Sequence, residues 1–179
     1  MNIKALAVFC GSKNGKDPVY NEHAAMLGKL LAQHQIRLIY GGGRKGIMGT
    51  IADAVMRHQG TVTGVITEKL IEWEHQHEGI TELLVVDHMH TRKKKMYELC
   101  DAAMILAGGF GTLDELFEMV TWNQLSIHNK HIFLLNSNGF YDHLIRHIQH
   151  LEQSGFLYDN VPERIHYLSG PEELLPYIR

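Results

Sequence analysis

Short apolar runs alternate with segments of helical periodicity along this chain, and that alternation is the feature that most constrains its fold. The runs have the length of strands and are apolar throughout, as strands buried on both faces are. The expected strands span residues 3–9, 36–40, 61–66, 83–86, 102–107, 132–135 and 165–168. Strands that alternate with helices pair in parallel. The pattern therefore predicts an α/β fold, a doubly wound parallel sheet with helices on both faces, in a single domain of residues 1–179.

Glycine turns follow three of the expected strands. They lie at Gly11, at residues 41–49 and at residues 108–111. Ligands of doubly wound sheets bind beyond the carboxyl ends of the strands. We expect the three turns to meet at one rim of the sheet and to form the binding site there.

The segment Asp101–Leu116 combines a strand, a glycine turn and the start of a helix. Helical spacing resumes at Thr112, and the apolar stripe of that helix comprises Leu113, Leu116, Phe117, Met119 and Val120. Glycines let the backbone approach a ligand, while the free N–H groups and the dipole of a helix start favour an anion. The segment therefore predicts a phosphate site, with Glu115 close to the sugar that carries the phosphate.

Composition limits the class of ligand and the compartment. The chain has 179 residues, 45% hydrophobic content and a formal net charge of −3, which gives no electrostatic case for a nucleic acid polymer as partner. Cys10 and Cys100 lie far apart without metal-ligand spacing, which suits a reducing compartment. Residues 1–10 lack the apolar core of a signal peptide, and no segment has the length and hydropathy of a membrane span. We expect a cytoplasmic protein without membrane contact.

The glycine turns favour a mononucleotide over a dinucleotide. The first strand leads into Gly11 alone, so the Gly-x-Gly-x-x-Gly fingerprint is missing from its usual place. The Gly-Lys-Ser/Thr phosphate loop is missing as well.

Five motifs together resemble one family. Residues 108–115, Gly-Gly-Phe-Gly-Thr-Leu-Asp-Glu, are similar to the Pro-Gly-Gly-x-Gly-Thr-x-x-Glu signature of the Lonely Guy family, and residues 89–93 resemble its Met-His-x-Arg-Lys signature. Residues 10–12, 41–49 and 121–130 agree in order and spacing. Ala107 stands where the family usually has proline, which should loosen the turn without removing a chemical group.

The resemblance implies a Rossmann-like cytokinin riboside 5′-monophosphate phosphoribohydrolase. Such an enzyme cleaves a purine-type nucleoside 5′-monophosphate, AMP included, into free base and ribose 5-phosphate without a metal or another cofactor. It also implies a homodimer with sites near the interface. The catalytic pair carries over to Arg92 and Glu115. The implied substrate-binding residues are Ser12, Gly43, Glu74, Lys93, Gly108, Gly109, Phe110, Gly111, Thr112, Leu113, Asp114 and Thr121.

Chemistry gives the pair distinct tasks. Cleavage of an N-glycosidic bond builds positive charge on the ribose, which the Glu115 carboxylate can stabilise while it orients or deprotonates water. Arg92 does not readily release a proton, so it stabilises charge and clamps the substrate. Its planar fork suits the departing base and the phosphate equally, and the sequence leaves both roles open.

Several residues have simpler interpretations. Thr112 and Glu115 also form a capping box, with Thr112 as N-cap, and Asp114 suits a partner of the helix dipole. Within the basic run we expect Lys94 on the surface. Arg44 and Lys45 fit phosphate contact and simple exposure equally. Without the resemblance, Glu74 reads as a surface acid in an irregular segment spanning residues 67–79.

Three other hypotheses compete with the hydrolase. The thirteen histidines include His75/His77 and His88/His90 pairs, but no third ligand has convincing spacing, so we expect no metal site. A nucleotide carrier would have no need of both Arg92 and Glu115. A lysine decarboxylase would need a site for pyridoxal phosphate, and no part of the sequence is arranged for one. Met119, Phe117 and Trp122 are expected in the core or at a dimer contact.

Overall fold

The computed structural model describes residues 1–158 and 162–178, and of residues 73, 74 and 162 it describes the backbone alone. The strands are β1 (Ala5–Phe9), β2 (Arg37–Tyr40), β3 (Val62–Thr67), β4 (Glu82–Val86), β5 (Ala102–Ile105), β6 (Ile132–Leu135) and β7 (Ile165–Leu168). The α-helices are α1 (Val19–Gln33), α2 (Gly46–Arg57), α3 (Glu68–Glu74), α4 (Met89–Leu99), α5 (Phe110–Gln124) and α6 (Asp142–Gln153). Short 3₁₀ helices are η1 (Ser137–Gly139), η2 (Pro162–Arg164) and η3 (Pro171–Tyr177).

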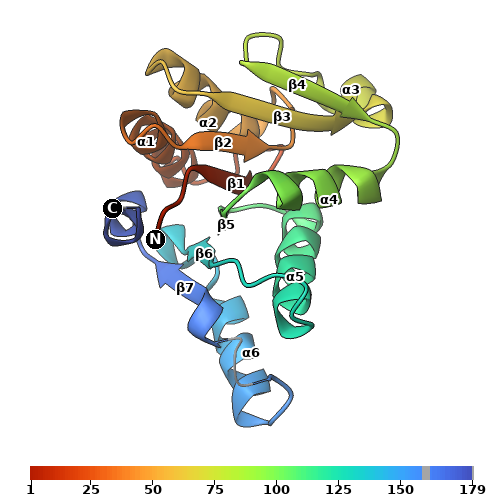
Figure 1. Ribbon diagram of the computed structural model, residues 1–179. Coiled ribbons are helices and arrows are strands. Elements are labelled where there is room, and N and C mark those ends of the chain that lie inside the picture. Colours follow the sequence, from red (N-terminus) through yellow and green to blue (C-terminus); the bar gives the residue numbers. More distant parts are fainter. Residues whose placement is uncertain (159–161, 179) are drawn as a thin grey trace.

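The strands of the described chain form one parallel sheet in the order β4-β3-β2-β1-β5-β6-β7 (Figure 1). In the register of the central strands, Leu6 pairs with Leu38 of β2 and Val8 pairs with Met104 of β5. The chain first winds outward from β1 to β4, then returns to β5 and winds outward in the other direction. The winding direction therefore changes between β1 and β5, where such sheets bind ligands.

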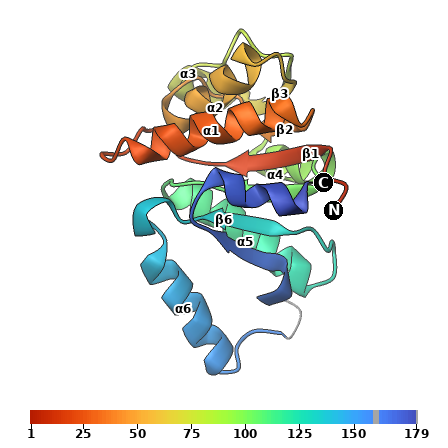
Figure 2. The ribbon, with the colours of Figure 1, turned by 90° about the vertical axis from the view of Figure 1, so that its left-hand side faces the viewer.

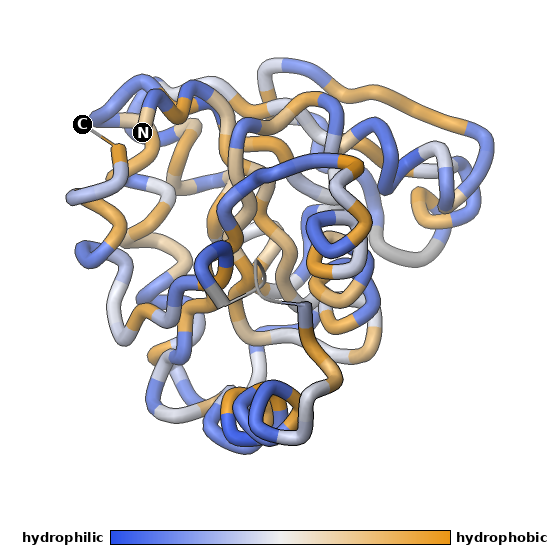
Figure 3. The backbone as a smooth tube through the Cα atoms, turned by 60° about the horizontal axis from the view of Figure 1, so that its bottom comes forward, coloured by the Kyte–Doolittle hydropathy of each residue, from blue (hydrophilic) through white to orange (hydrophobic). Residues whose placement is uncertain are grey.

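Helices cover both faces of the sheet (Figure 2). Leu6 and Val8 of β1 point to the face covered by α1, α2 and η3, whereas Ala7 and Phe9 point to the face covered by α4, α5 and α6. This alternation follows from the two-residue period of a strand and explains why the strands are apolar throughout. Hydrophobic segments accordingly run through the middle of the molecule (Figure 3). The predicted doubly wound α/β fold is confirmed.

The prediction of an irregular segment over residues 67–79 is wrong in its first half. Residues 68–74 form α3, and the Thr67 hydroxyl caps this helix by accepting a hydrogen bond from the Leu70 N–H at 3.3 Å. After the helix, the His77 N–H donates to the Gly42 carbonyl at 3.0 Å, and Gly43 forms an isolated antiparallel bridge with Gln76. These contacts fasten the segment to the second glycine turn. Helix α3 is seven residues long, too short to show helical periodicity.

None of the helices in the described part of the chain combines the length and the apolar character that crossing a membrane requires.

Candidate active site

A cavity of about 560 Å³ lies beyond the carboxyl ends of β1, β2 and β5. All three glycine turns line it, through Gly11, Gly41 and Gly108. The Gly11 N–H donates to the Ala107 carbonyl at 3.0 Å and so joins the first turn to the third. The prediction that the turns share one rim is confirmed.

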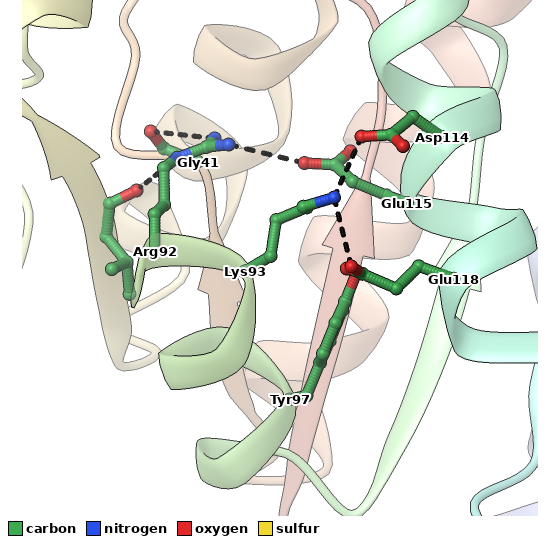
Figure 4. Close-up of polar contacts among 8 residues, drawn as sticks. Gly41, Arg92, Lys93, Tyr97, Asp114, Glu115 and Glu118 are labelled. Atoms are coloured by element: carbon green, nitrogen blue, oxygen red, sulfur yellow. Dashed lines mark hydrogen bonds and ion pairs between the residues drawn. The ribbon is translucent and has the colours of Figure 1, made fainter. Parts of the chain in front are cut away.

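Arg92, on the first turn of α4, is held in the cavity wall by three hydrogen bonds (Figure 4). Its Nε–H donates to the Val65 carbonyl at 2.9 Å, and one terminal nitrogen donates to the Gly41 carbonyl at 3.4 Å. The other terminal nitrogen donates to the Glu115 carboxylate at 3.3 Å. A Cβ atom at Gly41 would lie 2.2 Å from the guanidinium, so glycine is required there. The carboxyl ends of β2 and β3 thus fix where Arg92 meets Glu115.

Glu115 is buried on α5, where burial raises its pKa to about 7 although the Arg92 charge opposes that shift. The carboxyl group therefore changes its protonation state near neutral pH. The capping-box interpretation is wrong: α5 begins at Phe110 with Gly109 as N-cap, so Thr112 and Glu115 lie inside the helix. Helix α5 therefore starts before Thr112, where the sequence pattern predicted its N-cap, and includes a glycine of the turn in its first residues.

Lys93 lies beside Arg92 but pairs with different acids. Its ammonium is 3.0 Å from an Asp114 carboxylate oxygen and 3.1 Å from a Glu118 carboxylate oxygen. The Tyr97 hydroxyl donates to the second oxygen of Glu118 at 2.6 Å. Burial disfavours the charged ammonium, but the hydrogen bonds to the two acids outweigh it and raise the pKa of Lys93. Lys93 is therefore a stable cation in the cavity wall.

Sequence reasoning missed Glu118 and Tyr97, neither of which lines the cavity. Tyr97 lies one helical turn after Lys93, and Glu118 lies one turn after Asp114. Residues four apart share a helix face. That spacing was visible in the sequence, but only the packing of α4 against α5 turns it into a contact.

The start of α5 leaves room for a ligand. Beta carbons built at Gly109 and Gly111 would meet no atom of the chain within 4 Å, and neither glycine has a positive φ. Both line the cavity beside the first N–H groups of α5. A helix start with bare backbone can bind an anion such as phosphate. At Gly108, in contrast, a Cβ would lie 2.1 Å from the Thr112 hydroxyl oxygen, so that glycine serves the turn itself.

The structure brings most of the predicted site residues to this cavity. Arg92 and Glu115 line it together with Ser12, Lys93, Gly108, Gly109, Phe110, Gly111, Thr112 and Asp114. Phe110 is 93% exposed at the cavity wall. Gly43, Leu113 and Thr121 do not line the cavity: Gly43 is buried in the bridge to Gln76, and Thr121 is exposed on α5. The Glu74 side chain lies outside the described residues.

The surroundings of the site resolve some of the simpler interpretations. Lys94 is exposed and lies 3.9 Å from Glu98, which confirms its expected place on the surface. Arg44 and Lys45 are exposed and are not part of the cavity wall. Ala107, which replaces the usual proline, is buried and lines the cavity. Met119 is buried in the core and Trp122 packs edge-on against Tyr97, whereas Phe117 is 43% exposed.

Comparison with known proteins identifies the family of the chain. A family model described as "Possible lysine decarboxylase" matches residues 48–178. The cytokinin riboside 5′-monophosphate phosphoribohydrolase of Rhodococcoides fascians is 42% identical over 177 residues, which is 98% of this chain and 89% of that protein. The enzyme of the same name, LOG7, from Arabidopsis thaliana is 44% identical over 87% of this chain and 71% of its own length. The chain belongs to the Lonely Guy family.

The fold of this Lonely Guy protein also occurs in more distant proteins. A molybdenum cofactor binding protein from Rippkaea orientalis superposes with a TM-score of 0.73 at 20% identity, over 99% of this chain and 96% of that protein. At that identity the likeness concerns the fold alone.

The residues of the cavity do not fit the decarboxylase description of the family model. Pyridoxal phosphate requires a lysine that can lose its proton to form a Schiff base. Lys93, the buried lysine of the cavity, is bound to two carboxylates that keep it protonated, and Lys13, the other lysine that lines the cavity, is exposed. For metals, the described residues contain no group of three or more His, Cys, Asp or Glu side chains arranged to hold an ion.

Proposed function

We propose that this Lonely Guy protein hydrolyses the N-glycosidic bond of a purine-type nucleoside 5′-monophosphate, either a cytokinin riboside monophosphate or AMP. The products are the free base and ribose 5-phosphate. The observation that carries the proposal is the buried Arg92–Glu115 contact at 3.3 Å, beside the open glycine turn that begins α5. It joins a carboxyl group that titrates near neutral pH to a fixed cation, at the rim where this fold binds ligands.

The glycine turn is suited to the phosphate end of the substrate. The N–H groups of the first turn of α5 and its dipole favour a negative charge. Gly109 and Gly111 allow the phosphate to approach this backbone. Glu115 lies four residues after Gly111 on the same helix, so a nucleotide bound by its phosphate places its ribose toward the carboxylate.

The reaction consumes one water molecule. As the bond from C1′ to the base nitrogen breaks, its electron pair leaves with the base and positive charge develops on the ribose. The Glu115 carboxylate stabilises that charge and accepts a proton from the water that attacks C1′. Glu115 then releases this proton, which ends on the departing base, so the carboxylate is regenerated and the water supplies a hydroxyl to the sugar and a proton to the base. Arg92 holds Glu115 in place and offers its charge to the departing base or to the phosphate.

The test is to incubate the purified protein with AMP and with an N6-prenylated AMP, and to measure the release of free base. Release by the wild type and its loss in Glu115→Gln and Arg92→Ala would support the proposal. Glu98→Gln, which removes an exposed carboxylate on α4, is the matched control and should leave the rate unchanged. Tight AMP binding without base release would instead favour a carrier protein. The ratio of the two rates identifies the preferred base.

We also propose that the protein forms a homodimer in the cytoplasm, with its sites near the interface. Exposed apolar side chains on the two helices that carry the site support this, notably Met89 on α4 and Phe117 on α5, which are 45% and 43% exposed. Both cysteines keep their thiols, which suits a reducing compartment. Light scattering on wild type and Phe117→Asp tests the assembly, and cell fractionation tests the compartment.

A further inference from the structure

Two cations from neighbouring positions of α4 face three acids from one stretch of α5. Arg92 pairs with Glu115, whereas Lys93 pairs with Asp114 and Glu118 (Figure 4). Glu115 follows Asp114 directly in the sequence and precedes Glu118 by three residues. The pairing is therefore selective among close neighbours, and something in the structure must determine it.

The Lys93 side chain alone does not determine which acids its ammonium pairs with. A lysine side chain is a flexible stem that ends in a compact charge with three donors. Asp114 is a weak restraint, because its side chain is 64% exposed. Glu118 is a stronger one, because its side chain is only 22% exposed and is itself held by a second group.

That second group is the Tyr97 hydroxyl, which donates to Glu118 at 2.6 Å. Tyr97 is 2% exposed, and its ring packs edge-on against Phe9 and Trp122, at centroid distances of 5.8 Å and 5.1 Å. The hydroxyl is thus a rigid anchor in the core. One oxygen of Glu118 faces this anchor and the other faces Lys93, so the carboxylate links the core to the cavity wall.

We propose that Glu118, oriented by the Tyr97 hydroxyl, is a positioning residue that holds the Lys93 ammonium beside Asp114 and away from Glu115. Only the effect of Glu118 on catalysis rests on the proposed function; its effect on the position of Lys93 does not. Without Glu118, the ammonium is free to turn toward Glu115, the neighbouring buried acid, which already lies within range of its charge. Glu115 would then have two cationic partners in place of one.

A second cationic partner would make Glu115 a weaker base. An opposite charge that moves into contact lowers the pKa of a carboxyl group. The groups that act on the Glu115 carboxyl from α4 and α5 are Arg92, Lys93, Tyr97 and Asp114. Other titratable groups line the same cavity, namely Cys10 and Lys13 after β1 and Tyr20 on α1. Of these, Lys93 is the cation that Glu118 controls.

The decisive experiment follows the titration of the Glu115 carboxyl directly, by NMR of protein with ¹³C-labelled glutamate, in wild type and Glu118→Gln. The Glu115 signal is assigned by its absence in Glu115→Gln. We expect the midpoint to fall by about one pH unit in Glu118→Gln. Tyr97→Phe removes only the hydroxyl anchor and should shift the midpoint in the same direction by a smaller amount. It also provides the test if Glu118→Gln does not fold.

Loss of the Glu118 charge could also act on Glu115 through space, and the Lys93→Met background separates the two effects. If Lys93 carries the effect, adding Glu118→Gln to Lys93→Met leaves the midpoint unchanged. A shift that persists without Lys93, or an unchanged midpoint in Glu118→Gln, would overturn the proposal. Glu98→Gln, which removes the exposed partner of Lys94, is the charge-matched control and should not move the midpoint.

The titration needs no turnover, so it is independent of the proposed function. If the wild type releases base, the acidic limb of its pH–rate profile should move with the NMR midpoint in each variant. If the wild type releases no base, the proposed function fails, while the titration still decides whether Glu118 positions Lys93.

Discussion

The guanidinium of Arg92 and the carboxylate of Glu115 meet at 3.3 Å, and each comes from a helix on the same face of the sheet. Both side chains are largely buried, with relative exposures of 7% and 11%. A buried acid next to one cation would ordinarily be ionised, but here burial outweighs the cation and raises the pKa of Glu115 to about 7. This arrangement fits the proposed catalytic role of the pair better than a stabilising one, since buried ion pairs contribute little net stability.

Replacing Arg92 by lysine should abolish most activity although the charge is kept. Lysine cannot donate simultaneously to the Val65 carbonyl, the Gly41 carbonyl and Glu115 as the guanidinium does. We expect kcat/KM for AMP to fall by about 100-fold, the usual effect of losing a fixed electrostatic contact. Steady-state measurement of base release gives this kcat/KM. A value within threefold of wild type would show that the planar geometry of the guanidinium is unimportant.

The pH dependence of kcat/KM should follow the ionisation of Glu115. Because the carboxylate is the working form in the proposed reaction, log kcat/KM should rise with pH at unit slope up to about 7 and then level off. The profile is measured from pH 5 to 9 with AMP well below its KM, since kcat/KM reports groups of the free protein. A rate that falls through this range would mean that the protonated acid is the active form.

Replacing Gly111 by alanine should stabilise the protein and weaken nucleotide binding at the same time. Alanine is the better helix former by up to about 1 kcal/mol, and its methyl group meets no atom of the chain. The methyl group would instead occupy space in the cavity beside the α5 N-terminus. We expect a higher melting temperature and about tenfold weaker binding of AMP, measured by calorimetry.

Gly41→Ala is the contrasting variant for that experiment. Its Cβ would lie 2.2 Å from the Arg92 guanidinium, so it should lose both stability and activity. If Gly111→Ala bound AMP as tightly as wild type, the phosphate would not lie against this turn.

Glu115→Gln should be more stable than wild type above neutral pH. The folded protein holds the Glu115 proton more tightly than the unfolded chain does, because its pKa is raised from 4.5 to about 7. The stabilisation from the protonated acid is complete below pH 4.5 and is lost as the pH rises to 7. Glutamine mimics the protonated acid at every pH. The free energy of unfolding in urea at pH 8 should therefore be higher for the variant by up to about 3 kcal/mol, since one pKa unit corresponds to roughly 1.4 kcal/mol.

The same comparison at pH 4.5 is the control for this prediction, because the two proteins should then unfold with nearly equal free energies. A variant that is less stable than wild type at pH 8 would show that the Arg92–Glu115 pair is stabilising after all.

The strands and the shared rim of the glycine turns could be predicted because they depend on local sequence pattern. The apolar run of residues 102–107 and the glycines after it are recognisable without knowing what surrounds them. Helix α3 could not be predicted from periodicity, since its seven residues are mostly polar and span only two turns. The helical start at Phe110 was missed because glycines disfavour a helix interior yet are accepted in its first turn.

The site residues divide in the same way. Arg92 and Glu115 were predicted from motifs, but the three partners of the guanidinium come from residues 41, 65 and 115, which only the fold brings together. Glu118 and Tyr97 lie outside the five family motifs, and their contact depends on how α4 packs against α5. Sequence motifs indicate the candidate catalytic side chains, whereas the packing of the fold determines which residues hold them in place.

The change of winding direction between β1 and β5 affects how this protein must assemble. Gly41 and Val65 belong to the half of the chain wound outward to β4, Glu115 belongs to the half built on β5, and Arg92 sits on the helix that crosses from one to the other. Neither half contains both Arg92 and Glu115. A nascent chain that has emerged only as far as Cys100 therefore contains Arg92 and its two carbonyl partners but not its acidic partner. Catalytic competence during refolding should consequently appear only after the two halves have docked, later than the recovery of helical signal.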